Sequence, residues 1–168
     1  MPRGFDLDSA YRQYLDSALA ATDRLAFTRA SMRFIASLRN GHSDFNDRVV
    51  QQAYAASTGF TVVPVGREFV VAWSRVDGLR PGDVIAAIDG EPMEQVFRRL
   101  QPYVSASHEA WARRSLFWYR NRVLFPERFT LSLADGLTLP IVRRDVPQAG
   151  TGTGQVVESR WLVPDRVA

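Results

Sequence analysis

The first third of the chain repeats apolar residues at intervals of three and four positions. This spacing places them on one face of a helix, so it predicts a first helix that ends near Leu19 and a second that ends at Asn40-Gly41. Asp6 or Asp8 is expected to cap the first helix and Thr22 the second, because their side-chain oxygens accept the unpaired N–H groups of a first turn.

The end of the second helix leads into a third, shorter helix. Gly41 is expected to close the second helix in the left-handed conformation, since glycine has no Cβ that would clash there. A helix over 47–56 follows, with Asp44 or Asn46 as its cap. Together these segments predict a small helical subdomain over residues 1–57.

From Gly59 onward the pattern changes to the alternation of apolar and polar residues that is typical of strands. It predicts strands over 60–65 and 68–73, joined by a tight turn at Gly66-Arg67. A third strand over 84–88 is closed by Asp89-Gly90.

Two helical patterns and a hairpin come after the third strand. The helices are predicted over 94–100 and from Ser105 or Ser107 to about Arg122. The hairpin joins strands over 129–133 and 137–142 through Asp135-Gly136, a pair that favours a tight turn. From residue 147 the chain is rich in Gly, Thr and Pro, which indicates a linker, and its last residues have the pattern of a strand that is cut short.

Composition removes several kinds of chemistry. The 168 residues contain no cysteine, so disulfides, thiolate nucleophiles and cysteine metal sites are excluded. All 21 basic residues are arginine, and because a guanidinium stays protonated in proteins, no Ser-Lys dyad is possible within this chain. The net charge of +3 comes from arginines mixed with 18 acidic residues, a distribution that does not favour a nucleic-acid partner.

No apolar run is long enough for a membrane span, and the first residues do not form a signal peptide. We therefore expect no membrane span, and the compartment stays open between the cytoplasm and the periplasm or the cell exterior.

The most specific pattern in the chain is GLRPGDVIAAIDG over 78–90. A glycine-aspartate turn leads into a strand whose Val84, Ile85 and Ile88 are expected in the core, and a second turn at Asp89-Gly90 reverses the chain. This pattern resembles the most recognisable stretch of a bacterial PDZ domain. The predicted fold is therefore α+β, with the helical subdomain followed by a PDZ-like β-barrel or sandwich over 58–145 that carries a helical insert at about 105–122.

PDZ domains bind peptides by strand addition, and backbone N–H groups hold the peptide's C-terminal carboxylate. The resemblance implies that Gly59 and Phe60 form the carboxylate loop, and that Thr61 and Val62 continue into the accepting strand. It implies that the 94–100 helix forms the other wall, with Val96 and Leu100 as lining residues. The alternative is that Gly59-Phe60 is only a junction between a loop and a strand.

One of the two histidines, His42, lies in the segment LRNGHSDF over 38–45. Taken with the PDZ pattern that follows it, this segment resembles the N-terminal half of the C-terminal-processing and tricorn-type serine peptidases, the tail-specific protease family. The resemblance implies that His42 is a general base, which takes a proton from a serine in a later domain of the same polypeptide. Tricorn-type members carry a serine directly before that histidine, where this chain has Gly41. The alternative role for His42 is to interact with the dipole at a helix C-terminus.

The chain carries no Gly-x-Ser-x-Gly elbow, and two histidines without a cluster of partners predict no metal site. No cofactor is expected either. The sequence therefore predicts the N-terminal, substrate-recognising portion of a serine endopeptidase, inactive alone, whose linker and missing catalytic domain begin in residues 146–168. Its expected partners are that domain and a protein or peptide substrate, bound through a C-terminal segment. The alternatives are a non-catalytic PDZ peptide-binding module or adaptor, and a basic nucleic-acid binder.

Overall fold

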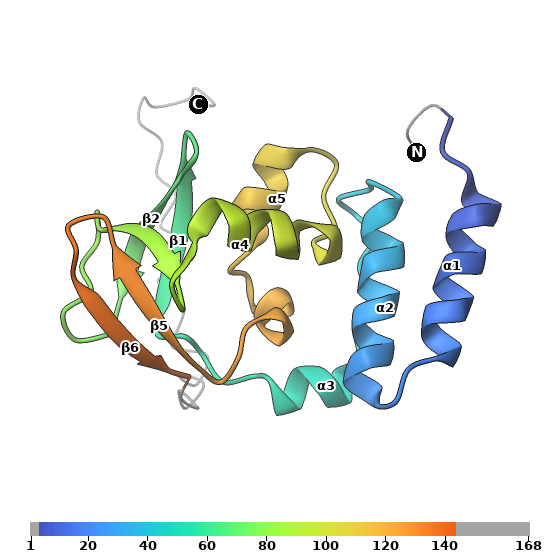
Figure 1. Cartoon of the computed structure of the whole chain (residues 1–168), viewed down its shortest axis with the longest axis horizontal. Coiled ribbons are helices and arrows are strands. Elements are labelled where there is room, and N and C mark those ends of the chain that lie inside the picture. Colours follow the sequence, from blue (N-terminus) through green and yellow to red (C-terminus); the bar gives the residue numbers. More distant parts are fainter. Residues whose placement is uncertain (1–3, 144–168) are drawn as a thin grey trace, which may run out of the picture.

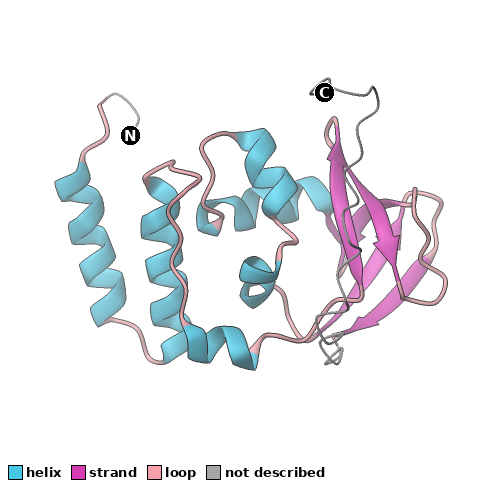
Figure 2. Cartoon of the chain, turned by 180° about the vertical axis from the view of Figure 1, so that it is seen from behind, coloured by secondary structure: helices cyan, strands magenta, loops and turns pink. Residues whose placement is uncertain are grey.

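The computed structural model describes residues 4–143 of the chain. Figure 1 shows the helices of the first third beside the later helices, and Figure 2 shows the strands gathered at the opposite end of the molecule. The predicted α+β class is confirmed. The predicted linker, final strand and start of a catalytic domain over 146–168 lie outside the described residues.

The three predicted N-terminal helices are present as α1 (Leu7–Leu19), α2 (Arg24–Ser37) and α3 (Arg48–Ala53). Asp6 caps α1, as predicted, by accepting from the Ser9 N–H at 3.0 Å.

Two predicted caps are wrong by one to three positions. Asp23, rather than Thr22, caps α2 by accepting from Ala26 at 2.7 Å. Asp47, rather than Asp44 or Asn46, caps α3 and accepts from both Val49 and Val50. In both cases the cap is the aspartate immediately before the first helical residue, where its carboxylate reaches the N–H groups of the first turn.

The left-handed residue at the end of α2 is also not the predicted one. Arg39, with a φ of 48°, takes this conformation, and Gly41 does not. Because a side chain in this region costs about 1 kcal/mol relative to glycine, Arg39 is an unusual choice for the position.

The strands predicted within residues 4–143 are present: β1 (Phe60–Val65), β2 (Glu68–Ser74), β3 (Val84–Ile88), β5 (Arg128–Leu133) and β6 (Thr138–Val142), with the short β4 (Glu91–Pro92) beside β3. They form one antiparallel sheet in the order β1-β2-β3-β5-β6. The sheet is open within the described residues, with β1 and β6 at its edges, so a PDZ-like barrel is not shown.

The helical segments between β4 and β5 are α4 (Met93–Leu100), η1 (Gln101–Tyr103), α5 (Glu109–Ser115) and η2 (Tyr119–Leu124). The predicted continuous helix to Arg122 is wrong, because the chain breaks after Ser115. The break lets Leu116 become fully buried and lets Phe117 stack on Phe125 at 5.0 Å between ring centroids. The Ser115 carbonyl accepts from the Trp118 N–H at 2.9 Å and from the Asn121 amide at 2.7 Å. Packing of these side chains therefore overrides the helical pattern.

Nearly all buried apolar residues of the described part belong to one cluster, which extends from Met32 on α2 and Val50 on α3 into the sheet. Two guanidinium groups, those of Arg113 and Arg143, are also buried, each 5% exposed. Within residues 4–143, no helix is both long and apolar enough to cross a membrane.

Candidate functional site

The turn that carries His42 is held together by its own hydrogen bonds. The Asn40 Oδ1 accepts from the His42 backbone N–H at 3.0 Å, and the Asn40 carbonyl accepts from the Ser43 N–H at 3.1 Å. The Asn40 amide also donates to the Ser43 hydroxyl at 3.0 Å. These bonds fix the backbone on both sides of His42.

A second segment, far away in the sequence, fastens this turn to the rest of the molecule. The Ser105 hydroxyl lies 2.9 Å from the Asn40 carbonyl and also within hydrogen-bonding distance of the Ser43 carbonyl. Gly41 packs beside the Ser107 backbone and the Trp111 indole. The turn with His42 is therefore attached to the loop that leads into α5, and this attachment was not expected from the sequence.

His42 itself is exposed. Among the described residues, no side chain forms a hydrogen bond or ion pair with its imidazole, and Ser43 uses its hydroxyl to accept from Asn40. An exposed imidazole on a fixed turn is available to a group brought from another domain. The general-base role of His42 stays a prediction.

The residues predicted for peptide binding lie at the β1 edge and in the core beneath it. Gly59 has a φ of 80°, and its carbonyl accepts from the Arg75 N–H at 2.8 Å. Thr61 is exposed, whereas Phe60 and Val62 are 4% and 8% exposed and point into the core. A peptide at this edge therefore has backbone groups and the outward side chains of the strand to contact.

The predicted second wall of the groove is buried. Val96 and Leu100 are 1% and 5% exposed and belong to the same core cluster as Phe60 and Val62. Helix α4 packs against β3, while α5 is the helix that packs against β1. The structure thus places the four side chains together, but as core rather than as an open surface. Their role in peptide binding stays a prediction.

Metal ligands do not gather in the part of the chain that the structure describes. No group of three or more His, Cys, Asp or Glu residues there could hold a metal ion.

Sequence reasoning identified His42 from the pattern around it but missed the residues that hold its turn. Ser105 follows Asn40 by 65 positions, and nothing in the local pattern of either residue points to the other. The nearest signal was the prediction that Ser105 or Ser107 caps the following helix. That prediction is wrong, because His108 caps α5 and the Ser105 hydroxyl lies near the Asn40 and Ser43 carbonyls instead.

Neither a protein-family model nor a curated protein sequence matches this chain. Among solved structures, the fold is similar to that of CPAF, a chlamydial serine protease. A serine-to-alanine mutant of CPAF matches at 20% identity with a TM-score of 0.60, over 83% of this chain and 28% of that chain.

Mature CPAF complexed with lactacystin matches at 19% identity with a TM-score of 0.59, and mature CPAF at 18% with a TM-score of 0.54. Both likenesses cover 83% of this chain and 29% of the other. The chain therefore spans less than a third of the length of these proteins. At this level of identity the likeness shows a shared fold.

Proposed function

We propose that this chain is the N-terminal, substrate-recognising portion of a serine endopeptidase of the tail-specific, tricorn-like type. The observation that carries the proposal is the shared fold with CPAF over 83% of the chain, combined with an exposed histidine on a fixed turn. The chain alone is inactive, because the nucleophile is supplied by a segment outside it.

In the proposed reaction, His42 takes the proton of a serine hydroxyl as the oxygen attacks the scissile carbonyl. It then gives that proton to the leaving amine, so the imidazole is a base in the first step and an acid in the second. A histidine suits both steps because its unperturbed pKa lies close to neutrality. The hydrogen bonds of Asn40 and Ser105 support this role, since they fix the turn without occupying either ring nitrogen.

The test uses the longest natural polypeptide that contains these 168 residues. We expect it to hydrolyse an unfolded protein and to react with a fluorophosphonate probe, and we expect His42→Ala to lower kcat by about 10⁴-fold or more. His108→Asn is the matched control, because His108 caps α5 by accepting from the Trp111 N–H and asparagine is also a good cap. Equal loss in both variants, or none in His42→Ala, would contradict the proposal.

The second candidate function is a non-catalytic PDZ peptide-binding module or adaptor. It is favoured by the open β1 edge in the described sheet, which offers unpaired backbone groups to an extended peptide. A natural polypeptide that binds peptides but neither hydrolyses protein nor reacts with the fluorophosphonate would support this function over the first.

A further inference from the structure

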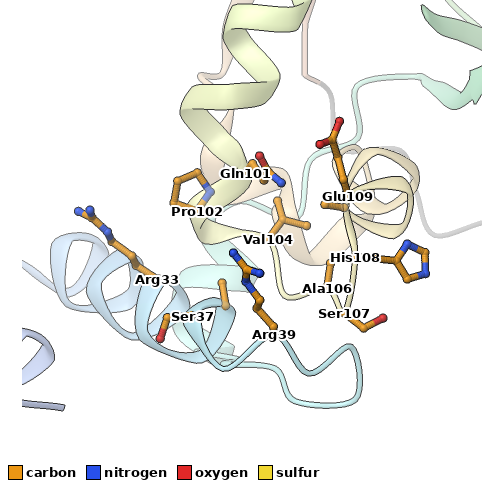
Figure 3. A pocket seen from close by; sticks show the side chains of 12 residues that line it. Arg33, Ser37, Arg39, Gln101, Pro102, Val104, Ala106, Ser107, His108 and Glu109 are labelled. Atoms are coloured by element: carbon orange, nitrogen blue, oxygen red, sulfur yellow. The ribbon is translucent and has the colours of Figure 1, made fainter. Parts of the chain in front are cut away.

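A pocket of about 490 Å³ lies between the end of α2, η1 and the start of α5, as Figure 3 shows. Its floor is apolar and buried, and consists of Ala36, Val104, Ala106 and Ala112. Polar groups from all three elements surround this floor. The size is that of a site for a small organic group with a few directed hydrogen bonds.

The two arginines of the pocket occupy different places. In Figure 3 the Arg39 side chain points toward Val104, whereas the Arg33 side chain extends outward, away from the other labelled side chains. No hydrogen bond or ion pair within residues 4–143 engages either guanidinium. Since an arginine carries five donors and no acceptor, Arg39 presents unused donors to whatever enters the pocket.

The one acidic side chain of the pocket is already neutralised. Glu109 pairs with Arg113 at 2.9 Å, and Arg113 also pairs with Glu94 at 2.7 Å. Glu94 in turn pairs with Arg98, so these four side chains carry two positive and two negative charges. The positive charges of Arg33 and Arg39 are therefore uncompensated, and the pocket favours an anion.

The backbone at Arg39 adds an independent observation. A residue that ends a helix in the left-handed conformation is usually glycine, yet an arginine is present here with a φ of 48°. The conformation turns the Arg39 side chain away from the direction that α2 would give it and into the pocket (Figure 3). Strained non-glycine residues of this kind cluster at ligand-binding sites.

We propose that this pocket binds a carboxylate of the peptide substrate, with Arg39 as its main ligand and the Gln101 amide beside it. The apolar floor accommodates the short aliphatic stem of an acidic side chain or of a chain end, which an inorganic anion lacks. A planar carboxylate also matches the two parallel N–H groups of a guanidinium. This inference rests on the proposed function, because it takes the ligand to be a peptide.

The position of the pocket makes it a candidate specificity site. Arg39 lies three residues before His42, and Ser107, on the opposite wall, contacts Gly41. A peptide carboxylate held by Arg39 would therefore place the neighbouring peptide bonds close to the turn that carries His42.

The experiment is an NMR titration of the full chain, with the indole N–H of Trp111 and the amides of Ser107 and Ala112 as reporters of the pocket. The probes are a capped pentapeptide with a central glutamate, the same peptide with glutamine, and the glutamine peptide with a free C-terminus. Arg39→Gln removes the positive charge. It leaves the strain energy of the left-handed backbone unchanged, because glutamine and arginine are equally unfavourable at a positive φ. Arg12→Gln, an exposed change on α1, is the matched control.

We expect the glutamate peptide to shift these signals and Arg39→Gln to weaken its binding by about tenfold, the usual effect of losing one charged hydrogen bond. Arg12→Gln should leave the affinity unchanged. If the glutamine peptide with a free C-terminus binds as well as the glutamate peptide, the pocket accepts the carboxylate of a chain end. If it does not bind, the pocket accepts the carboxylate of a side chain. Three results would overturn the inference. They are equal binding of the glutamate and glutamine peptides, equal affinity of Arg39→Gln and Arg12→Gln for the glutamate peptide, and displacement of that peptide by an equal concentration of inorganic phosphate.

Failure of this inference is distinguishable from failure of the proposed function. If proteolysis depends on His42 but peptide binding does not depend on Arg39, the proposed peptidase function is retained and the carboxylate-binding role of the pocket is rejected. If peptide binding depends on Arg39 but the protein has no proteolytic activity, the carboxylate-binding role of the pocket is retained and the proposed peptidase function is rejected.

Discussion

At the scale of single residues, the buried guanidinium of Arg143 joins three segments of the chain. It donates to the carbonyl oxygens of Ala56, Arg122 and Phe125 at 3.0, 2.9 and 3.0 Å, and to that of Tyr54. Burial lowers the pKa of the Arg143 guanidinium, but a guanidinium keeps its proton in proteins. Its several donors thus hold the loop before β1 to η2.

We expect Arg143→Lys to destabilise the protein by about 3 kcal/mol or more, because one ammonium group cannot reach all four carbonyls in the two segments and leaves some of them buried without a partner. Urea unfolding followed by circular dichroism measures the loss. Arg128→Lys, an exposed change on β5, is the control and should alter the free energy of unfolding little. Similar losses in the two variants would show that Arg143 does not have this role.

Ser105 provides a second prediction at this scale. Ser105→Ala removes the hydroxyl that joins the Asn40 and Ser43 carbonyls, at a cost of about 1 kcal/mol in the free energy of unfolding. The more specific effect is on the turn: amide exchange at His42 should become faster and its imidazole signals should broaden. Hydrogen exchange by NMR measures this.

The control for Ser105 is Ser17→Ala, which removes a hydroxyl bonded to an exposed carbonyl on α1. Ser105→Thr keeps the hydroxyl and should restore slow exchange at His42. A His42 amide that exchanges equally fast in Ser105→Ala and in the unmodified protein would mean that the turn is held by its own hydrogen bonds alone.

At the scale of secondary-structure elements, Asp47 connects α3 to α2. Its side chain caps α3 and also accepts from the Arg24 guanidinium at 2.7 Å. The hydrogen bond from Arg24 is the largest cause that lowers the pKa of Asp47 below its ordinary value. Because the folded protein then binds this proton less tightly than the unfolded chain, the contribution of Asp47 is complete above a pH of about 4 and is lost as the pH falls through the lowered pKa.

We therefore expect Asp47→Asn to reduce the free energy of unfolding near neutral pH. We also expect that free energy to fall less steeply as the pH is lowered, since asparagine keeps the cap but has no charge to titrate. Urea midpoints measured between pH 7 and pH 2.5 test this. Asp8→Asn, an exposed change in the first turn of α1, is the control. An unchanged slope in Asp47→Asn would contradict the assignment of this acid sensitivity to Asp47.

Some elements follow directly from the sequence and others do not. The difference is how far apart along the chain the residues lie whose interactions define each element. The strands follow from alternation and from turns such as Gly66-Arg67 and Asp135-Gly136, all of which are local signals. The break after Ser115 depends on the stacking of Phe117 on Phe125, and the attachment of the His42 turn depends on the Ser105 hydroxyl. These contacts exist only once the chain has folded, so no local pattern contains them.

The same distinction applies to Arg39. The sequence predicts that α2 ends at Asn40-Gly41 and assigns the left-handed position to glycine, which is the usual residue. The structure uses Arg39 instead, and its side chain then lines the pocket between α2 and η1. The departure from the usual helix end is therefore a signal of a site, visible only when the backbone angles are known.

At the scale of the whole molecule, one core cluster joins the helical region to the sheet. Helix α2 packs against η1, and Ser105 ties the His42 turn to the same loop region. The candidate base and the pocket are thus fixed relative to the sheet, whose β1 edge is the proposed site of strand addition (Figure 1).

That edge leads to a prediction for the full chain. Because Phe60 and Val62 are buried while Val63 and Val65 are exposed, an added peptide would be held mainly by the backbone of β1. We expect a peptide with a free C-terminus to slow amide exchange within β1, and the same peptide with an amidated C-terminus to do so far less. Hydrogen exchange measured residue by residue tests this, with β6 as an internal control because it is the other edge of the described sheet. Slower exchange at β6 alone, or equal effects of the two peptides, would show that neither the β1 edge nor a carboxylate loop at Gly59 recognises the substrate.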